Sequence, residues 1–127
     1  MVERTWVTLS GTGNVQYNPG WTALPKSIEI TLSQEGTGVD SVVRFSTGWA
    51  DGTLNRCDSI YGDSTGSRTE KSTTKCIIAN SRVSGAITKT LEASLVSFDT
   101  ISPGVYGFTL NQTILTESFQ VSVRSDS

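Results

Sequence analysis

The sequence predicts an all-β protein: an antiparallel β-sandwich, jelly-roll-like, with eight or nine short strands. Ser and Thr number 18 each among 127 residues and Ala only five, and Thr favours strands whereas Ala favours helices. Apolar and polar residues alternate with a period of two, which is typical of half-buried strands. Turn-forming residues separate the alternating segments. A chain of this length is one domain, so we expect a single β-sandwich over residues 1–127.

The strands are expected where the alternation is clearest. Residues 27–33 alternate without interruption, and residues 119–124 and 91–96 follow the same pattern. Further strands are expected at residues 6–10, 42–47, 56–61, 75–80 and 108–112. Ten apolar residues are predicted to fill the core between two sheets: Ile28, Ile30, Leu32, Phe45, Ile77, Leu95, Phe108, Leu110, Phe119 and Val121.

Glycine, proline and aspartate mark the connections between these strands. Turns are expected at residues 11–14, 18–20, 35–38, 51–52 and 84–85. The polar stretch 62–74 is predicted to be an exposed loop, and residues 1–5 and 125–127 are predicted to be short flexible ends.

The composition limits the possible catalytic chemistry mainly through the residue type that it lacks. The chain has no histidine, which is the most common general base near neutral pH and the most common metal ligand. Paired carboxylates or a lysine-assisted serine would need a sizeable cleft, which a small strand-rich domain rarely supplies. We therefore expect no enzymatic activity, no cofactor and no metal.

The charge and the hydropathy pattern argue against two classes of partner. The net charge of −2 argues against nucleic acid and anionic lipid. No apolar run approaches the length of about 18 residues that a membrane span needs, and the N-terminus has no signal pattern. We expect neither nucleic acid nor a membrane as partner.

Two small groups of residues leave alternatives open. Cys57 and Cys76 each lie in an expected strand, so they are either a disulfide across neighbouring strands or two buried thiols, the latter being favoured. Asp51, Asp58 and Asp63 lie close in sequence, but they lack the alternate spacing of a calcium loop. Capping of turns by their side chains is the better interpretation.

The large aromatic residues are the candidates for a binding surface. Trp and Tyr side chains in small sandwiches fill the core, form subunit contacts or provide a platform for sugar rings. Three Trp and three Tyr are available: Trp6, Trp21, Trp49, Tyr17, Tyr61 and Tyr106. Those predicted to form an interface or a sugar-stacking site are Trp21, Trp49, Tyr61 and Tyr106.

Seven short segments carry a resemblance to known proteins. They are GTGNV at 11–15, LPK at 24–26, FSTGWADG at 45–52, NRC at 55–57, KCII at 75–78, VSFD at 96–99 and GFTLN at 107–111. Together they resemble a group of small β-domains encoded in bacteriophages and prophages, although none of the segments is catalytic. The sequence departs from that group in a longer turn at residues 101–106 and a more polar tail at residues 121–124.

The resemblance implies a structural protein of the virion, made in the cytoplasm of the host bacterium. The expected function is that of a capsid decoration (cement) protein or a head- or tail-fibre domain that binds the particle surface. The alternative is a carbohydrate-binding module, the receptor-binding domain of a fibre, with a surface glycan as ligand. The expected partners are capsid or tail proteins and further copies of the chain, with a homotrimer favoured because linked copies gain avidity.

Overall fold

The structure is a computed structural model that describes residues 2–35 and 42–127. Within these residues the regular structure consists of strands alone, which confirms the all-β prediction. The ten strands are β1 (Val2–Leu9), β2 (Gly13–Trp21), β3 (Ser27–Glu35), β4 (Val43–Ala50), β5 (Asn55–Asp63), β6 (Gly66–Ser72), β7 (Ile77–Val83), β8 (Ala86–Ser102), β9 (Val105–Leu115) and β10 (Phe119–Asp126).

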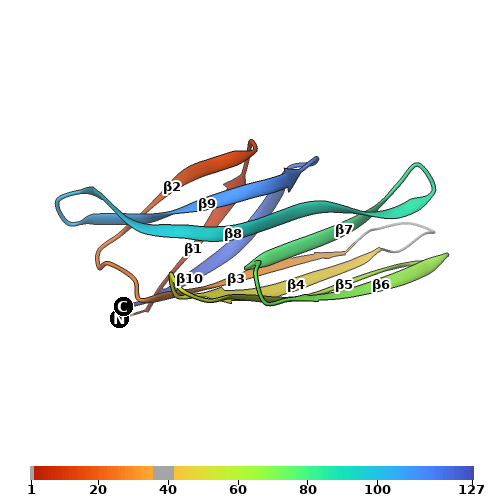
Figure 1. Ribbon diagram of the computed structural model, residues 1–127, viewed down its shortest axis with the longest axis horizontal. Coiled ribbons are helices and arrows are strands. Elements are labelled where there is room, and N and C mark those ends of the chain that lie inside the picture. Colours follow the sequence, from red (N-terminus) through yellow and green to blue (C-terminus); the bar gives the residue numbers. More distant parts are fainter. Residues whose placement is uncertain (1, 36–41) are drawn as a thin grey trace.

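Two antiparallel sheets pack face to face in an elongated molecule (Figure 1), which confirms the β-sandwich. The strand order is β1-β10-β3-β4-β5-β6 in the six-stranded sheet and β2-β9-β8-β7 in the four-stranded sheet. The chain passes between the sheets after β1, β2, β6 and β9, and elsewhere consecutive strands pair as hairpins. The topology is therefore closer to two meanders than to the two Greek keys of an ideal jelly roll.

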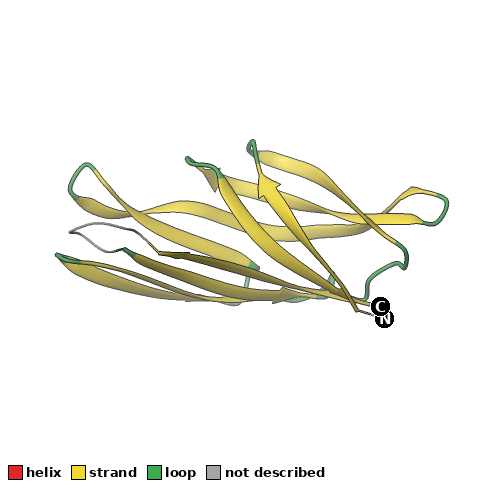
Figure 2. Ribbon diagram, turned by 180° about the vertical axis from the view of Figure 1, so that it is seen from behind, coloured by secondary structure: helices red, strands yellow, loops and turns green. Residues whose placement is uncertain are grey.

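The two ends of the chain lie side by side and belong to the six-stranded sheet (Figure 2). Val2 pairs with Asp126, so the prediction of flexible ends is wrong for residues 2–5 and 125–126. Strand β10 pairs with β3 only as far as Ser122 and Thr31, beyond which the two strands part. A groove of about 570 Å³, lined by Trp6 and Phe119 among others, opens where they separate.

The core lies between the sheets and is centred on aromatic contacts. Phe108 is fully buried, with its ring centroid 5.5 Å from that of Tyr17 and 5.4 Å from that of Trp21. Nine of the ten predicted core residues are buried. The exception is Phe45, which is 41% exposed because it points away from the interior of the sandwich.

Two predicted connections are strands, which explains why the structure has ten strands. The predicted loop 62–74 contains β6, an edge strand of polar residues that pairs with β5 through a tight turn. The predicted turns at 11–14 and 18–20 flank or interrupt β2, where a bulge between Tyr17 and Trp21 accommodates Pro19 and Gly20.

Two further predicted turns can be compared directly with the structure. The turn at 84–85 is confirmed, with positive φ angles of 51° at Ser84 and 83° at Gly85, and so is the turn at 51–52. Of the predicted turn at 35–38, residues 36–38 lie outside the described residues.

The two layers lie very close together where β7 begins. A Cβ atom at Gly48 of β4 would collide with the backbone carbonyl oxygen of Cys76, which directly precedes β7. Only glycine permits this approach of two backbones. The contact fixes β7 against the inner side of β4 and β5, so the outer side of these two strands remains free for other contacts.

Candidate functional site

The outer face of the six-stranded sheet carries large apolar side chains that the fold leaves exposed. Val43, Phe45 and Trp49 point outward from β4, and Ile60 of β5 lies opposite Phe45 and is 50% exposed. Residues two apart on a strand share a face, so these side chains line one side of the molecule. We call Val43, Phe45 and Ile60 the apolar patch.

A groove of about 450 Å³ lies on the same face near the β4–β5 turn. We call it the Trp49 groove. Its lining residues are Glu29, Thr47, Gly48, Trp49, Leu54, Arg56, Cys57, Asp58, Lys71, Ser72 and Thr73. In the register of the sheet Trp49 lies between Glu29 of β3 and Arg56 of β5. The indole ring, which is 36% exposed, therefore has an anionic and a cationic neighbour.

The turn that forms one end of the groove is built by Asp51. Its Oδ1 accepts hydrogen bonds from the backbone N–H groups of Thr53 at 2.9 Å and Leu54 at 2.7 Å. The Leu54 and Thr53 hydrogen bonds hold the pKa of Asp51 below its ordinary value, and the charge of Arg56 adds to the effect. The turn is therefore ordered around an ionised carboxylate, and it presents the Leu54 side chain beside Trp49.

The other charged residues of the groove are only loosely paired. Lys71 Nζ lies 4.0 Å from Asp58 Oδ1, and both side chains are largely exposed. Glu29 Oε2 lies 3.8 Å from Arg124 Nη2. Within the described part of the chain the Arg56 side chain forms no hydrogen bond and no ion pair. Exposed pairs at such distances contribute little to stability, so these groups are available to a ligand.

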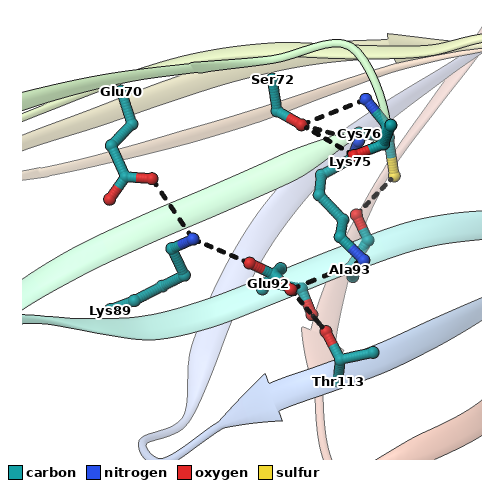
Figure 3. Close-up of polar contacts among 9 residues, drawn as sticks. Glu70, Ser72, Lys75, Cys76, Lys89, Glu92, Ala93 and Thr113 are labelled. Atoms are coloured by element: carbon teal, nitrogen blue, oxygen red, sulfur yellow. Dashed lines mark hydrogen bonds and ion pairs between the residues drawn. The ribbon is translucent and has the colours of Figure 1, made fainter.

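A second charged cluster is partly buried at the place where Glu70 of β6 reaches toward β8 (Figure 3). Lys89 Nζ lies 3.3 Å from Glu70 Oε2 and 2.8 Å from Glu92 Oε2. Lys75 Nζ lies 3.5 Å from Glu92 Oε1, which also accepts a 2.9 Å hydrogen bond from Thr113. The bond from Lys89 lowers the pKa of Glu92, and the same bond raises the pKa of Lys89. Catalytic acids and bases have pKa values near the working pH, so this cluster fits a link between the sheets better than proton transfer.

Cys57 and Cys76 are both buried free thiols in the structure. Burial raises the pKa of Cys57 to about 11 and that of Cys76 to about 12. The Cys76 thiol donates a 3.5 Å hydrogen bond to the carbonyl oxygen of Ala93. Because the thiolate is the reactive form of cysteine, neither residue has the character of a nucleophile.

The four predicted site residues do not form one surface. Trp21 is 2% exposed and stacks on Phe108, and Tyr106 lies opposite it in the four-stranded sheet, partly buried against the core. Tyr61 is 3% exposed, and its hydroxyl donates to Asp63 at 2.8 Å. Trp21 and Tyr61 therefore present no ring to a ligand or partner. Of the four, Trp49 alone lies in a groove on the outer face.

The three clustered aspartates serve separate purposes. Asp63 accepts hydrogen bonds of 2.9 Å from the backbone N–H groups of Thr65 and Gly66, and Arg82 Nε lies 2.7 Å from its Oδ2. Turn capping is thus confirmed for Asp51 and Asp63, whereas Asp58 faces outward. In the described residues no group of three or more His, Cys, Asp or Glu could hold a metal ion.

The site residues predicted from the sequence did not include Leu54, Arg56 or Ile60. One available signal was the turn at Asp51 and Gly52, because a hairpin around it brings Trp49 opposite Arg56. The outward direction of Ile60 depends on the same register.

Fold and site together define a small antiparallel β-sandwich with an aromatic groove and an apolar patch on one outer face. Comparison of the chain with protein-family models, with curated proteins and with solved structures finds no match. In the part of the chain that the structure describes, no helix is long and apolar enough to cross a membrane.

Proposed function

We propose that this chain is a structural protein of a bacteriophage particle, a capsid decoration protein or a head- or tail-fibre domain that docks as a homotrimer on the particle surface. The observation that carries the proposal is the apolar patch. Val43, Phe45 and Ile60 are large, mutually adjacent and exposed on neighbouring strands. Contiguous exposed apolar surface on a small domain marks an interaction site. The segments that resemble phage-encoded β-domains supply the particle context.

The energetics favour contact through the face of the sheet. Full burial of a large apolar side chain contributes about 1.5–3 kcal/mol, so covering three half-exposed side chains per copy stabilises an assembly by several kcal/mol. Edge strand β6 carries Arg68, Glu70 and Lys71, and charges along an edge oppose strand-to-strand association. Association through the apolar patch avoids that edge.

Light scattering at micromolar concentration tests the assembly. We expect a mass three times the 13.6 kDa of one chain for the parent and a single-chain mass for Ile60→Lys. The matched control is Val96→Lys, which alters a valine on β8 that is 46% exposed and should leave the mass unchanged. A parent mass near that of one chain would refute the trimer.

The virion context has its own test. Mass spectrometry of purified particles from a host that carries the gene should detect the chain, and cryo-microscopy should locate it on the capsid or the tail. Particles that lack the chain would contradict the proposal whatever its oligomeric state.

A second function, carbohydrate binding, is favoured by a different observation. Trp49 is 36% exposed and lines a groove bordered by charged and hydroxyl side chains, and sugars stack on exposed aromatic rings in grooves of this kind. A glycan array separates the two functions, since a purely structural protein should bind none of the glycans.

A further inference from the structure

We propose that the Trp49 groove binds a saccharide unit that carries a carboxylate, such as a uronic acid or a sialic acid, with the sugar ring against Trp49 and the carboxylate on Arg56. The proposal names the ligand class of the site and rests on the second proposed function, carbohydrate binding.

The size and the lining of the groove suit a sugar ring. Its volume of about 450 Å³ falls within the range of about 300–1,000 Å³ that is usual for small-molecule sites. Trp49 is fixed by its place between two neighbouring strands, and Leu54 adds an apolar edge beside it. The C–H face of a pyranose can pack on the indole, while its hydroxyl groups point to the polar rim.

The rim provides partners for hydroxyl groups. Thr47 and Thr73 offer hydroxyls that both donate and accept, whereas the Ser72 hydroxyl oxygen already accepts hydrogen bonds from the backbone N–H groups of Thr74 and Lys75. Asp58 and Lys71 are 4.0 Å apart and largely exposed, so a sugar hydroxyl can bridge them without breaking a strong pair.

The charge of the groove selects an acidic sugar. The negative charge of Glu29 is balanced by Arg124, and that of Asp58 is balanced by Lys71. The Arg56 side chain, opposite Trp49, forms no ion pair or hydrogen bond among the described residues, and the nearby Asp51 carboxylate, on which its charge acts, is already held by the backbone N–H groups of Thr53 and Leu54. A guanidinium group binds a carboxylate through two parallel hydrogen bonds, which makes Arg56 the group that distinguishes an acidic sugar from a neutral one.

The first experiment is a glycan array with matched acidic and neutral oligosaccharides, the acidic members bearing glucuronic acid or N-acetylneuraminic acid. Bound glycans are then titrated by tryptophan fluorescence in a Trp6→Phe background. In that background the remaining tryptophans are Trp21, which is buried, and Trp49, so a change on titration reports the groove.

We expect acidic glycans to bind and their neutral counterparts to bind at least about tenfold more weakly, because a hydrogen bond to a charged group contributes about 1.5–3 kcal/mol. Trp49→Ala should abolish binding, here followed by calorimetry. Arg56→Gln should remove the preference for the acid, and Arg56→Lys should restore part of it. The matched control is Arg68→Gln on β6, whose side chain is paired with Glu70 outside the groove and should not affect binding.

The possible failures are distinguishable. Equal binding of acidic and neutral glycans overturns this inference and leaves carbohydrate binding in place. Binding that survives Trp49→Ala, or that Arg68→Gln weakens as much as Arg56→Gln does, also overturns it, since the ligand then lies elsewhere. If no glycan binds, both the inference and the carbohydrate function are overturned. Because Trp49 and Arg56 lie on the surface, unchanged melting temperatures of the variants should show that they fold.

Discussion

Replacement of Phe108 by alanine is expected to remove a large share of the stability of the fold. The ring is fully buried between the sheets and contacts the rings of Tyr17 and Trp21. Truncation of a buried phenylalanine costs about 3–5 kcal/mol in total, and the contacts with two aromatic rings place this site in the upper part of that range. We therefore expect Phe108→Ala to lower the free energy of unfolding by about 4–5 kcal/mol, whereas the whole free energy of unfolding of a typical domain is about 5–15 kcal/mol.

Phe45 offers a matched control, because the same substitution on the outer face removes a ring that is 41% exposed. For Phe45→Ala we expect the free energy of unfolding to fall by about 1 kcal/mol or less, measured at a concentration where the chain is monomeric. The entropy of unfolding is about 2.1 cal/mol/K per residue, or about 0.27 kcal/mol/K for this chain, so a loss of 4 kcal/mol lowers the melting temperature by about 15 °C.

Urea unfolding followed by tryptophan fluorescence, together with thermal melting, measures both variants. The sandwich register requires Phe108→Ala to be far less stable than Phe45→Ala. Equal losses for the two, or a loss below about 1 kcal/mol for Phe108→Ala, would refute the assignment of inner and outer faces.

Three further perturbations test the interior. Because Lys89 lowers the pKa of Glu92, the Lys89–Glu92 pair stabilises the fold fully above the ordinary carboxyl pKa of 4.5, and this contribution is lost as the pH falls below that value. The urea concentration at the midpoint of unfolding should therefore fall below pH 4.5, and it should fall less in Glu92→Gln. With pKa values of about 11 and 12, Cys57 and Cys76 should react with a thiol reagent at pH 8 only after denaturation, and reductant should leave the melting temperature unchanged; a drop of several degrees with reductant would show a disulfide instead. Gly48→Ala should prevent or severely weaken folding because the added Cβ would collide with Cys76. Gly62→Ala is the control, since the nearest atom to a Cβ added there is 3.9 Å away. Equal melting temperatures for the two variants would contradict the close approach of β4 and β7.

Strands with one buried face could be predicted from the sequence because burial imposes a period of two. Residues 27–33 and 119–124 show this pattern, and their apolar members face the core. Strand β6 shows no such pattern, since its residues are polar and mostly exposed. Its position follows from the turn capped by Asp63 and from the reach of Glu70 to Lys89. The contact of Glu70 with Lys89 depends on a partner in the other sheet, which the sequence of β6 does not reveal.

The candidate site could be predicted only in part. Trp49 was among the predicted residues, but so were Trp21 and Tyr61, because the direction of an aromatic side chain depends on strand register and on what packs behind it. The bulge in β2 turns Trp21 onto Phe108, and pairing of β5 with β4 turns Tyr61 inward. Arg56 is an ordinary surface arginine in the sequence, and only the cross-strand register gives it Trp49 as a neighbour.

Strand β4 has small and polar residues on its inner face and large apolar residues on its outer face, and this arrangement connects the fold to the proposed binding surfaces. Its inward residues are Arg44, Ser46, Gly48 and Ala50, and its outward residues are Val43, Phe45, Thr47 and Trp49. Large apolar groups have no room on the inside at Gly48, where the backbone before β7 lies against β4. Strand propensity alone does not require Phe or Trp on the outside, because threonine would serve equally well in a half-exposed strand. Exposed aromatic side chains on such a strand contribute little to the stability of the monomer, and the contacts that we propose for the outer face would account for both Phe45 and Trp49.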